Sequence, residues 1–339
     1  MRKLYCGLDL HSTNTYCGME DHTGRRLPPA RLPNDITLIM NYLEPHKKNL
    51  AEVAVESTYN WYWLVDGLTE AGYKVRLANP NAIRQYDGLK NVNDQTDAFH
   101  LAHLLRLGIL PQGYIYPKDA RPVRDILRRR MLLVQQRTAQ LLSLEGQMMR
   151  HLGTRMKSRE IERLEEGGLD DLLTEPFLRL AADSAISVIR HLSDRIKIIE
   201  KAVSAHCKLK PEYAKLTTMI GVGPILATTI MLETGPIQRF SSDSNYSSYC
   251  RCAKADKMSN DKKKGQNNGK NGNKYLSWAF VEAANQCRRF CEPARKFCQR
   301  KTAKRNAVVA VKALACKLSK AAYFIMRDQE VFDPKKCFG

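Results

Sequence analysis

Apolar and polar positions follow two different patterns along the chain. Up to about residue 108, short apolar runs alternate with segments of helical spacing. From residue 120 onward, apolar residues recur at helical spacing over much longer stretches. The first pattern predicts a mixed α/β layer, and the second predicts a mainly helical remainder.

The α/β part is expected to begin with a hairpin. Its strands are predicted over residues 3–10 and 14–19, followed by a turn at 21–24. Two further strands are predicted over 50–55 and 73–78, because both are short apolar runs. Helices are predicted over 35–43, 59–71 and 94–108.

Long helices are predicted in the rest of the chain. An Arg-rich helix over 120–151 resembles a coiled-coil arm, and a helix over 185–206 offers it an antiparallel partner, so the pattern does not require dimerisation. Residues 152–184 carry no readable pattern. Helices are also predicted over 275–284 and 307–326, whereas the polar run 260–274 is not expected to pack.

The net charge is concentrated in the helical part. The 339 residues include 55 Lys and Arg against 35 Asp and Glu, a formal charge of +20. Residues 1–117 contain 12 basic and 12 acidic residues, so the remainder, with 43 against 23, carries the whole surplus. A surplus of this size favours a phosphate polymer as partner, because each neutralised phosphate releases a counterion.

Several features indicate a soluble intracellular protein. No run of 18 apolar residues and no secretory leader is present, so neither a membrane span nor a membrane partner is expected. The ten cysteines form no CxxC pair, which favours reduced thiols in a core. A zinc site formed by Cys250, Cys252, Cys287 and Cys291 is the alternative.

Four carboxylates stand out as candidate metal ligands. Asp9 interrupts an apolar strand, and Glu56 ends another, although an unpaired buried carboxylate is costly. Asp94 and Asp97 are three residues apart and share one face of a helix start. In a ribonuclease H-like layer these side chains can converge and hold two Mg²⁺ ions about 4 Å apart, with Mn²⁺ as a substitute. Individually, the same acids could serve as helix caps or ion-pair partners.

Basic residues and one glycine-rich turn are candidates for phosphate binding. The turn at 220–224 offers backbone N–H groups to a phosphate, or it is an ordinary turn between core helices. The flexible segment and the basic run that follow offer Lys and Arg side chains, or they are a solvated charged face. The candidate residues are Gly221, Gly223, Lys262, Lys263, Lys264, Lys270, Lys274, Arg288, Arg289, Arg295 and Lys296.

Four motifs resemble one known family. GLDLH at 7–11, VESTY at 55–59, NP at 79–80 and NDQTDA at 93–98 occur in the order found in the DEDD transposases of insertion sequences. That family includes Piv-type DNA invertases and recombinases directed by a structured bridge RNA. The resemblance implies a RuvC-like domain at 1–116, a helical coiled-coil arm at 117–210 and a helical transposase domain at 211–339.

The resemblance also implies a serine nucleophile. Aligning Tyr246 and Tyr249 with the aromatic positions of the family, and Gly272, Asn273 and Leu276 with its Gly-Asn-x-x-Leu motif, places Ser259 on that serine. The chain departs from the family where Arg251, Cys252 and Lys254 replace a Gly-Leu-x-Pro stretch and Asn260 replaces a glycine. Neighbouring serines at 241, 242, 244, 247 and 248 are the alternatives for this role.

The implied function is a transposase or site-specific recombinase. Attack by Ser259 on a phosphodiester would leave a phosphoserine linkage and a free 3′ hydroxyl, so strands could rejoin without ATP. The implied partners are donor and target double-stranded DNA, a structured guide RNA, and further copies of the chain in a dimer or tetramer. The implied location is the cytoplasm of a prokaryotic cell, with nucleoid association during activity. The alternatives are a RuvC-like endonuclease that hydrolyses branched DNA and a non-catalytic nucleic-acid-binding protein.

Overall fold

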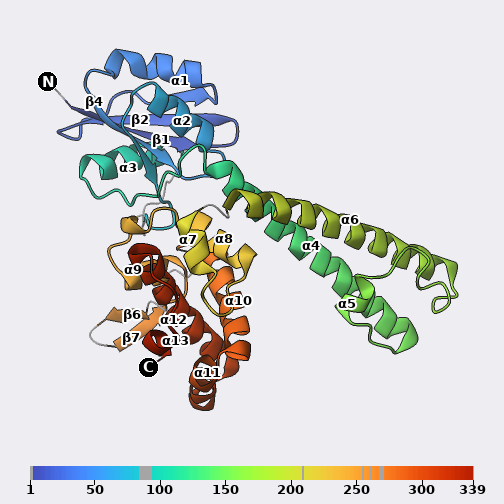
Figure 1. Cartoon of the computed structure of the whole chain (residues 1–339). Coiled ribbons are helices and arrows are strands. Elements are labelled where there is room, and N and C mark those ends of the chain that lie inside the picture. Colours follow the sequence, from blue (N-terminus) through green and yellow to red (C-terminus); the bar gives the residue numbers. More distant parts are fainter. Residues whose placement is uncertain are drawn as a thin grey trace. The chain divides into compact units, whose positions relative to one another are not determined.

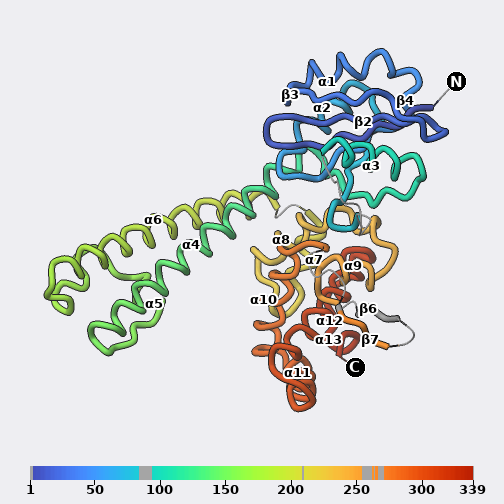
Figure 2. The backbone as a smooth tube through the Cα atoms, turned by 180° about the vertical axis from the view of Figure 1, so that it is seen from behind, coloured from blue at the N-terminus to red at the C-terminus, as the bar shows by residue number. Residues whose placement is uncertain are grey.

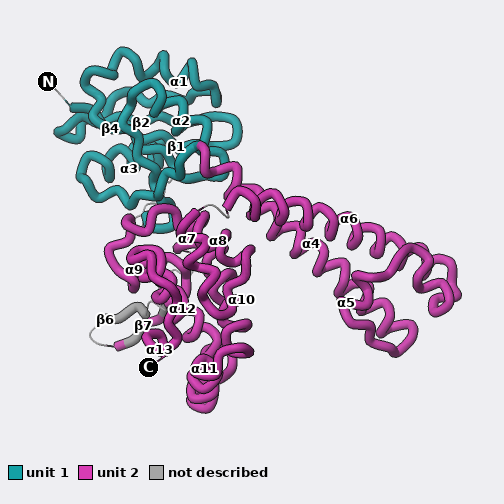
Figure 3. Tube along the Cα trace, viewed as in Figure 1, with its two compact units in different colours: residues 1–118 teal, residues 119–339 magenta. Residues whose placement is uncertain are grey.

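The computed structural model describes residues 3–83, 94–207, 210–253, 256–259, 262–266 and 271–338. The side chains of residues 256–259, 263 and 266 are outside this description. The chain divides into two compact units, residues 1–118 and residues 119–339 (Figure 3). The further boundary predicted at residues 210 and 211 stays a prediction.

The first unit is built on a mixed five-stranded sheet with the strand order β3-β2-β1-β4-β5. Strand β1 pairs antiparallel with β2 and parallel with β4, while β2–β3 is antiparallel and β4–β5 parallel. The predicted ribonuclease H-like fold class is therefore confirmed. The strands are β1 (Leu4–Leu10), β2 (Asn14–Asp21), β3 (Ala30–Pro33), β4 (Leu50–Glu56) and β5 (Val75–Ala78).

Helices cover both faces of this sheet (Figure 1). Successive side chains of a strand point to opposite faces, so Leu8 and Val55 pack beneath α1 and α2 in one core, while Ala54 packs with α3 in another. Asp9 and Glu56 have the parity of the α3 face. The helices of this unit are α1 (Ile36–Leu43), η1 (Glu44–His46), α2 (Tyr62–Glu70) and α3 (Asp94–Arg106).

Two glycines let the backbone of α3 lie directly on the sheet. A Cβ atom on Gly7 would lie 2.1 Å from the carbonyl oxygen of Ala98 and 2.7 Å from the nitrogen of Ala102. A Cβ atom on Gly18 would lie 2.7 Å from the nitrogen of Phe99. Since real Cβ atoms do not approach backbone this closely, the glycines of β1 and β2 fix how near α3 can come.

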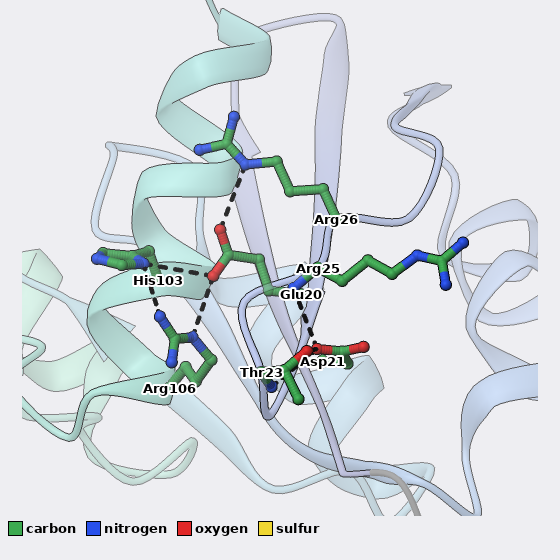
Figure 4. Close-up of polar contacts among 7 residues, drawn as sticks. All are labelled: Glu20, Asp21, Thr23, Arg25, Arg26, His103 and Arg106. Atoms are coloured by element: carbon green, nitrogen blue, oxygen red, sulfur yellow. Dashed lines mark hydrogen bonds and ion pairs between the residues drawn. The ribbon is translucent and has the colours of Figure 1, made fainter.

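A buried carboxylate holds the other end of α3 (Figure 4). Glu20 of β2 is only 2% exposed, and its Oε2 accepts a hydrogen bond from Arg106 Nε at 3.2 Å. The same oxygen lies 3.4 Å from His103 Nδ1, and Glu20 Oε1 lies 3.4 Å from Arg26 Nε. A buried charge surrounded by cationic partners is costly to unpair, so this cluster fixes α3 along the strands.

The second unit is mainly helical. Helices α4 and α6 lie side by side as a long pair, and the views from both sides show it (Figures 1 and 2). Leu144, Met148 and Ile186 are buried between them. The helices are α4 (Arg121–Leu152), α5 (Ser158–Ile161), α6 (Pro176–Cys207), α7 (Pro211–Leu216), α8 (Pro224–Thr234), η2 (Ile237–Arg239), α9 (Asp243–Tyr249), α10 (Lys274–Phe290), α11 (Glu292–Lys304), α12 (Ala307–Asp328) and α13 (Pro334–Phe338).

The C-terminal helices share one apolar core. Tyr246 and Phe280 are fully buried in it, and the Tyr246 hydroxyl lies 2.8 Å from Thr234 Oγ1. All ten cysteines are free thiols, and eight of them are buried. Burial raises the pKa of the Cys250 thiol well above its ordinary value. These cysteines therefore pack as small apolar residues, as their scattered positions predicted.

Strands β3, β6 and β7 and helix α9 are among the elements that were not predicted. Strand β3 forms one edge of the sheet, and the Ser-rich stretch folds as α9. Strand β6 (Asp256–Ser259) pairs with β7 (Lys262–Gln266), which lies in the polar run. The polar run was not expected to pack, and the pairing of β7 with β6 was not foreseen, because a hairpin closes through backbone hydrogen bonds and needs no apolar side chains. Within the described ranges, no helix combines the length and hydropathy needed for a membrane span.

Candidate active site

The four predicted acids come from three neighbouring elements of the first unit. Asp9 is the sixth of the seven residues of β1, and Glu56 ends β4, the parallel neighbour of β1. Asp94 and Asp97 stand in the first turn of α3, which packs against both strands. The structure thus places all four carboxylates at one end of the sheet, on the face that α3 covers.

The carboxyl groups of Asp9 and Glu56 influence each other, and both have raised pKa values. Asp9 is only 4% exposed, and this burial raises its pKa to about 6. The hydrogen bond with Glu56 lowers the pKa of Asp9, while the charges of Asp97 and Asp94 raise it further. Burial, followed by the hydrogen bond to Asp9, raises the pKa of Glu56 to about 7. Of the two acids, Glu56 has the higher pKa and therefore keeps a proton to higher pH.

The pKa of Asp97, in the first turn of α3, is raised as well. Burial raises the pKa of Asp97, and the charge of Asp94 adds to this effect, whereas His100 opposes it. Asp94 itself has a half-exposed side chain. A bound divalent cation would lower these pKa values, because it stabilises the ionised form of each carboxylate.

His11 belongs to this cluster although it was not among the predicted site residues. Its Nε2 lies 3.2 Å from Asp9 Oδ2 and 3.5 Å from Asp94 Oδ2. Donor atoms of Asp9, His11 and Asp94 all lie within 4.8 Å of one another, a separation compatible with one metal ion. The sequence did contain a signal: residues 9 and 11 are two apart, so along a strand they face the same side.

The donor set fits divalent cations. Mg²⁺ and Mn²⁺ are bound mainly by carboxylate oxygens, and of the four acids Asp9 and Asp94 have oxygens within 4.8 Å of each other and of His11. Burial first, and then the charges of neighbouring carboxylates, raise the pKa values of Asp9, Glu56 and Asp97, so a bound cation would favour their ionised forms. The buried Nε2 of His11 has no hydrogen-bond partner among the described residues, which adds a donor atom without an assigned role.

The raised pKa of Glu56 should make the free energy of unfolding depend on pH. Its folded-state pKa of about 7 exceeds the ordinary 4.5, so ionisation is favoured in the unfolded chain. This contribution to stability is fully present below about pH 4.5 and is lost as the pH rises through about 7. In chelating buffer, Glu56→Gln should therefore gain about 2 kcal/mol of unfolding free energy relative to wild type between about pH 4 and pH 8, allowing for partial solvation.

Urea titrations followed by tryptophan fluorescence at both pH values would measure this difference. Glu70→Gln is the matched control, because Glu70 is an exposed acid of the same unit, paired with Lys118. A difference for Glu56→Gln that falls no more steeply with pH than the difference for Glu70→Gln would show that the Glu56 pKa is not raised.

The predicted serine lies in the second unit, at the closed end of the β6–β7 hairpin. Ser259 is the last residue of β6 and pairs with Lys262, the first residue of β7. The Ser259 side chain is outside the described part of the structure. The backbone alone places this residue next to the turn of a polar hairpin.

The two ends of the serine-bearing segment are fastened together. Tyr249 O accepts a hydrogen bond from Asn273 N at 2.6 Å, and Arg251 Nε donates to Gly272 O at 3.0 Å. Gly272 has φ +94°, and a Cβ atom there would lie 2.5 Å from Tyr249 O, so glycine is required. The segment therefore leaves and re-enters the helical core at one point.

Asn273 anchors this junction in the core. Its Oδ1 accepts hydrogen bonds from the backbone nitrogens of Tyr275 and Leu276 and so caps α10. Its Nδ2 donates to Oε2 of Glu233 at 2.7 Å. Glu233, only 2% exposed, also accepts two hydrogen bonds from Arg128 of α4, at 2.6 and 2.8 Å. Sequence reasoning missed Glu233 and Arg128, because nothing local marks a pair 105 residues apart.

The predicted phosphate-binding residues fall into separate groups. Lys262 and Lys264 are exposed on the hairpin, Lys274 begins α10, and α10 and α11 carry the arginine-rich run. In that run Arg289, Arg295 and Lys296 are exposed, whereas Arg288 is half-buried. Lys270 is outside the described residues, as is the side chain of Lys263. Their role in nucleic-acid binding stays a prediction.

The glycine-rich turn has a packing role. Gly221 has φ +93°, and a Cβ atom there would lie 2.5 Å from the carbonyl oxygen of Ala283 in α10. Gly223 precedes α8 as its N-cap, and a Cβ atom on it would meet open space. Close packing explains the first glycine, and phosphate binding by the turn stays a prediction.

The fold and the acid cluster define a ribonuclease H-like DEDD domain, a class of enzyme domain that uses divalent metal ions in phosphoryl transfer. Residues 6–152 match a model of DEDD transposases of the IS110 type, and residues 213–299 match the model described as the transposase IS116/IS110/IS902 family. The chain belongs to the IS110 family of transposases, which catalyse phosphoryl transfer on DNA. No curated protein matches the chain.

Proposed function

We propose that this transposase cleaves and rejoins DNA through a covalent intermediate on Ser259, with Asp9, Glu56, Asp94 and Asp97 as its metal-binding acids. The observation that carries the proposal is the crowding of these four carboxylates at one sheet end, where burial and mutual repulsion raise the pKa values of Asp9, Glu56 and Asp97. Bound Mg²⁺ or Mn²⁺ would polarise a phosphoryl oxygen and stabilise the leaving oxygen.

The reaction conserves one phosphodiester-type bond. The Ser259 Oγ forms a bond to phosphorus as the bond from phosphorus to the 3′ oxygen breaks, and the proton lost by the serine is balanced by one gained at the 3′ oxygen. The product is a phosphoserine and a free 3′ hydroxyl, so the reverse attack by a 3′ hydroxyl rejoins strands without ATP. The chemistry requires the hydroxyl and the carboxylates in one active centre, from one chain or from two copies in a dimer or tetramer.

The proposed partners are donor and target DNA and a structured guide RNA. The exposed basic residues of the hairpin, α10 and α11 supply charge for phosphate backbones, including Lys262, Lys264, Arg289 and Arg295. The sequence resemblance to bridge-RNA-directed recombinases supports the RNA in particular. Sequencing of RNA that co-purifies with the chain tests this part of the proposal.

Mapping the attachment site tests the serine. The chain is incubated with Mg²⁺ and DNA carrying a nick that prevents rejoining, digested with protease and nuclease, and analysed by mass spectrometry. The proposal expects a nucleotide linked to the peptide that contains Ser259. A nucleotide on another residue would overturn the assignment of Ser259, and efficient cleavage with no linked peptide would indicate hydrolysis by water.

A further inference from the structure

The backbone of His11 is held unusually firmly for a residue just beyond the end of a strand. Its N–H donates to Asn14 O at 2.9 Å. Its carbonyl oxygen accepts two hydrogen bonds, from Asn34 Nδ2 and Asn60 Nδ2, each at 3.0 Å. Asn34 follows β3 and Asn60 precedes α2, so two separate loops converge on this one carbonyl.

Both asparagines are themselves oriented. Thr15 Oγ1 donates to Asn34 Oδ1, and Thr58 Oγ1 donates to Asn60 Oδ1, each at 2.8 Å. The His11 carbonyl can only accept, so the NH₂ of each asparagine must face it, and each amide oxygen is left to accept from a threonine hydroxyl. The position of His11 is thus over-determined, as is typical of a residue whose side chain must be aimed.

The side chain is aimed at the acids. Its Nε2 lies 3.2 Å from Asp9 Oδ2 and 3.5 Å from Asp94 Oδ2, and its ring meets Tyr16 edge-on. This nitrogen is buried, yet it forms no hydrogen bond of acceptable geometry within the ranges that the structure describes. A buried polar atom without a hydrogen bond is costly and calls for an explanation.

We propose that His11 is a nitrogen ligand of the divalent-ion site, alongside Asp9 and Asp94. A metal ion between the three donors would satisfy Nε2, and the asparagine pair would act as positioning residues that hold the ring. Mg²⁺ strongly prefers oxygen ligands, whereas transition-metal ions accept imidazole readily. His11 therefore shifts the site's preference from Mg²⁺ towards Mn²⁺. The inference rests on the proposed function only in taking these acids as metal ligands.

Mn²⁺ itself is the probe. The full-length chain is loaded with Mn²⁺ alone, and pulsed electron paramagnetic resonance detects a ¹⁴N nucleus bound to the ion. Titration calorimetry then compares the affinities for Mn²⁺ and Mg²⁺ of the wild type, His11→Ala and the control His22→Ala, which removes an exposed histidine at the hairpin turn. Asp9→Asn reports separately on the acid site.

The wild type and His22→Ala should show the ¹⁴N coupling, and His11→Ala should lose it. His11→Ala should also bind Mn²⁺ about tenfold more weakly, with a smaller change for Mg²⁺. A wild-type chain that binds Mn²⁺ without ¹⁴N coupling overturns the role of His11 and leaves the acids in place, and this result needs no variant to fold. A wild-type chain that binds neither ion, or Asp9→Asn binding like wild type, overturns the proposed acid site as well.

Discussion

Replacing Ser259 by alanine is expected to abolish the covalent attachment of the chain to cleaved DNA. Alanine has no hydroxyl, so no bond from oxygen to phosphorus can form. The loss of a nucleophile typically lowers turnover by about 10⁴-fold or more, because the remaining groups cannot replace it. Denaturing gels of DNA labelled on the strand that stays attached would measure the adduct, and labelled 3′ ends would measure cleavage.

Ser248→Ala is the matched control, since Ser248 is an exposed serine of α9 in the same unit. This variant should form as much adduct as wild type. An adduct that persists in Ser259→Ala would move the nucleophile to a neighbouring serine. Cleavage that continues in Ser259→Ala at the wild-type rate would mean that water, not this serine, attacks the phosphate.

Replacing Asp9 by asparagine is expected to lower the rate of strand cleavage by about a thousandfold. The carboxylate of Asp9 is the most central of the cluster, because Glu56, Asp94 and Asp97 all influence its pKa. An amide oxygen is a neutral and weaker ligand, so the charge that holds the cations falls where the transition state needs it. Cleavage rates measured over a range of Mg²⁺ concentrations would test this effect.

Measuring the stability of Asp9→Asn distinguishes a loss of catalysis from a failure to fold. Because burial disfavours the ionised form of Asp9, the neutral asparagine should not destabilise the metal-free fold at neutral pH. Asp9→Asn is therefore expected to unfold at a urea concentration no lower than wild type while being inactive. Glu70→Gln should keep wild-type cleavage. Wild-type cleavage by Asp9→Asn would remove Asp9 from the active site.

Much of the acid cluster could be predicted because strand geometry has a period of two. An acid in an apolar strand is conspicuous because burying a carboxylate costs free energy. Side chains alternate between the two faces of a sheet, so the position of the acid relative to the apolar residues shows which face it is on. Asp9 and Glu56 share that parity on adjacent parallel strands, and Asp97 follows Asp94 by nearly one helical turn. Local patterns of this kind suffice when the partners lie on regular elements.

The remainder depends on contacts that no local pattern encodes. The spacing of His11 from Asp9 indicates a shared face, but Asn34 and Asn60, which hold the His11 carbonyl, come from loops far apart in sequence and could not be foreseen. Glu233 and Arg128 meet only because α4 and α8 pack together. The β6–β7 hairpin escaped prediction because backbone pairing, rather than an apolar alternation, defines it.

Helix boundaries were predicted less well than helix positions. Helix α6 begins at Pro176, well before the predicted start at residue 185, since its first turns pack in the core around Leu173 and Ala182. Packing of this kind extends a helix beyond the stretch that its own periodicity indicates. The Ser-rich stretch became α9 because the Ser242 side chain caps its start and Tyr246 anchors it in the core.

The contact of α3 with Gly7 and Gly18 has a mechanical consequence. Main chain rests on main chain there, with no layer of side chains in between. Side chains can take up a small displacement by changing rotamer, but two abutting peptide backbones have no such freedom. We therefore expect β1 and the start of α3 to move together, so that the separation of Asp9 and Asp97 stays constant.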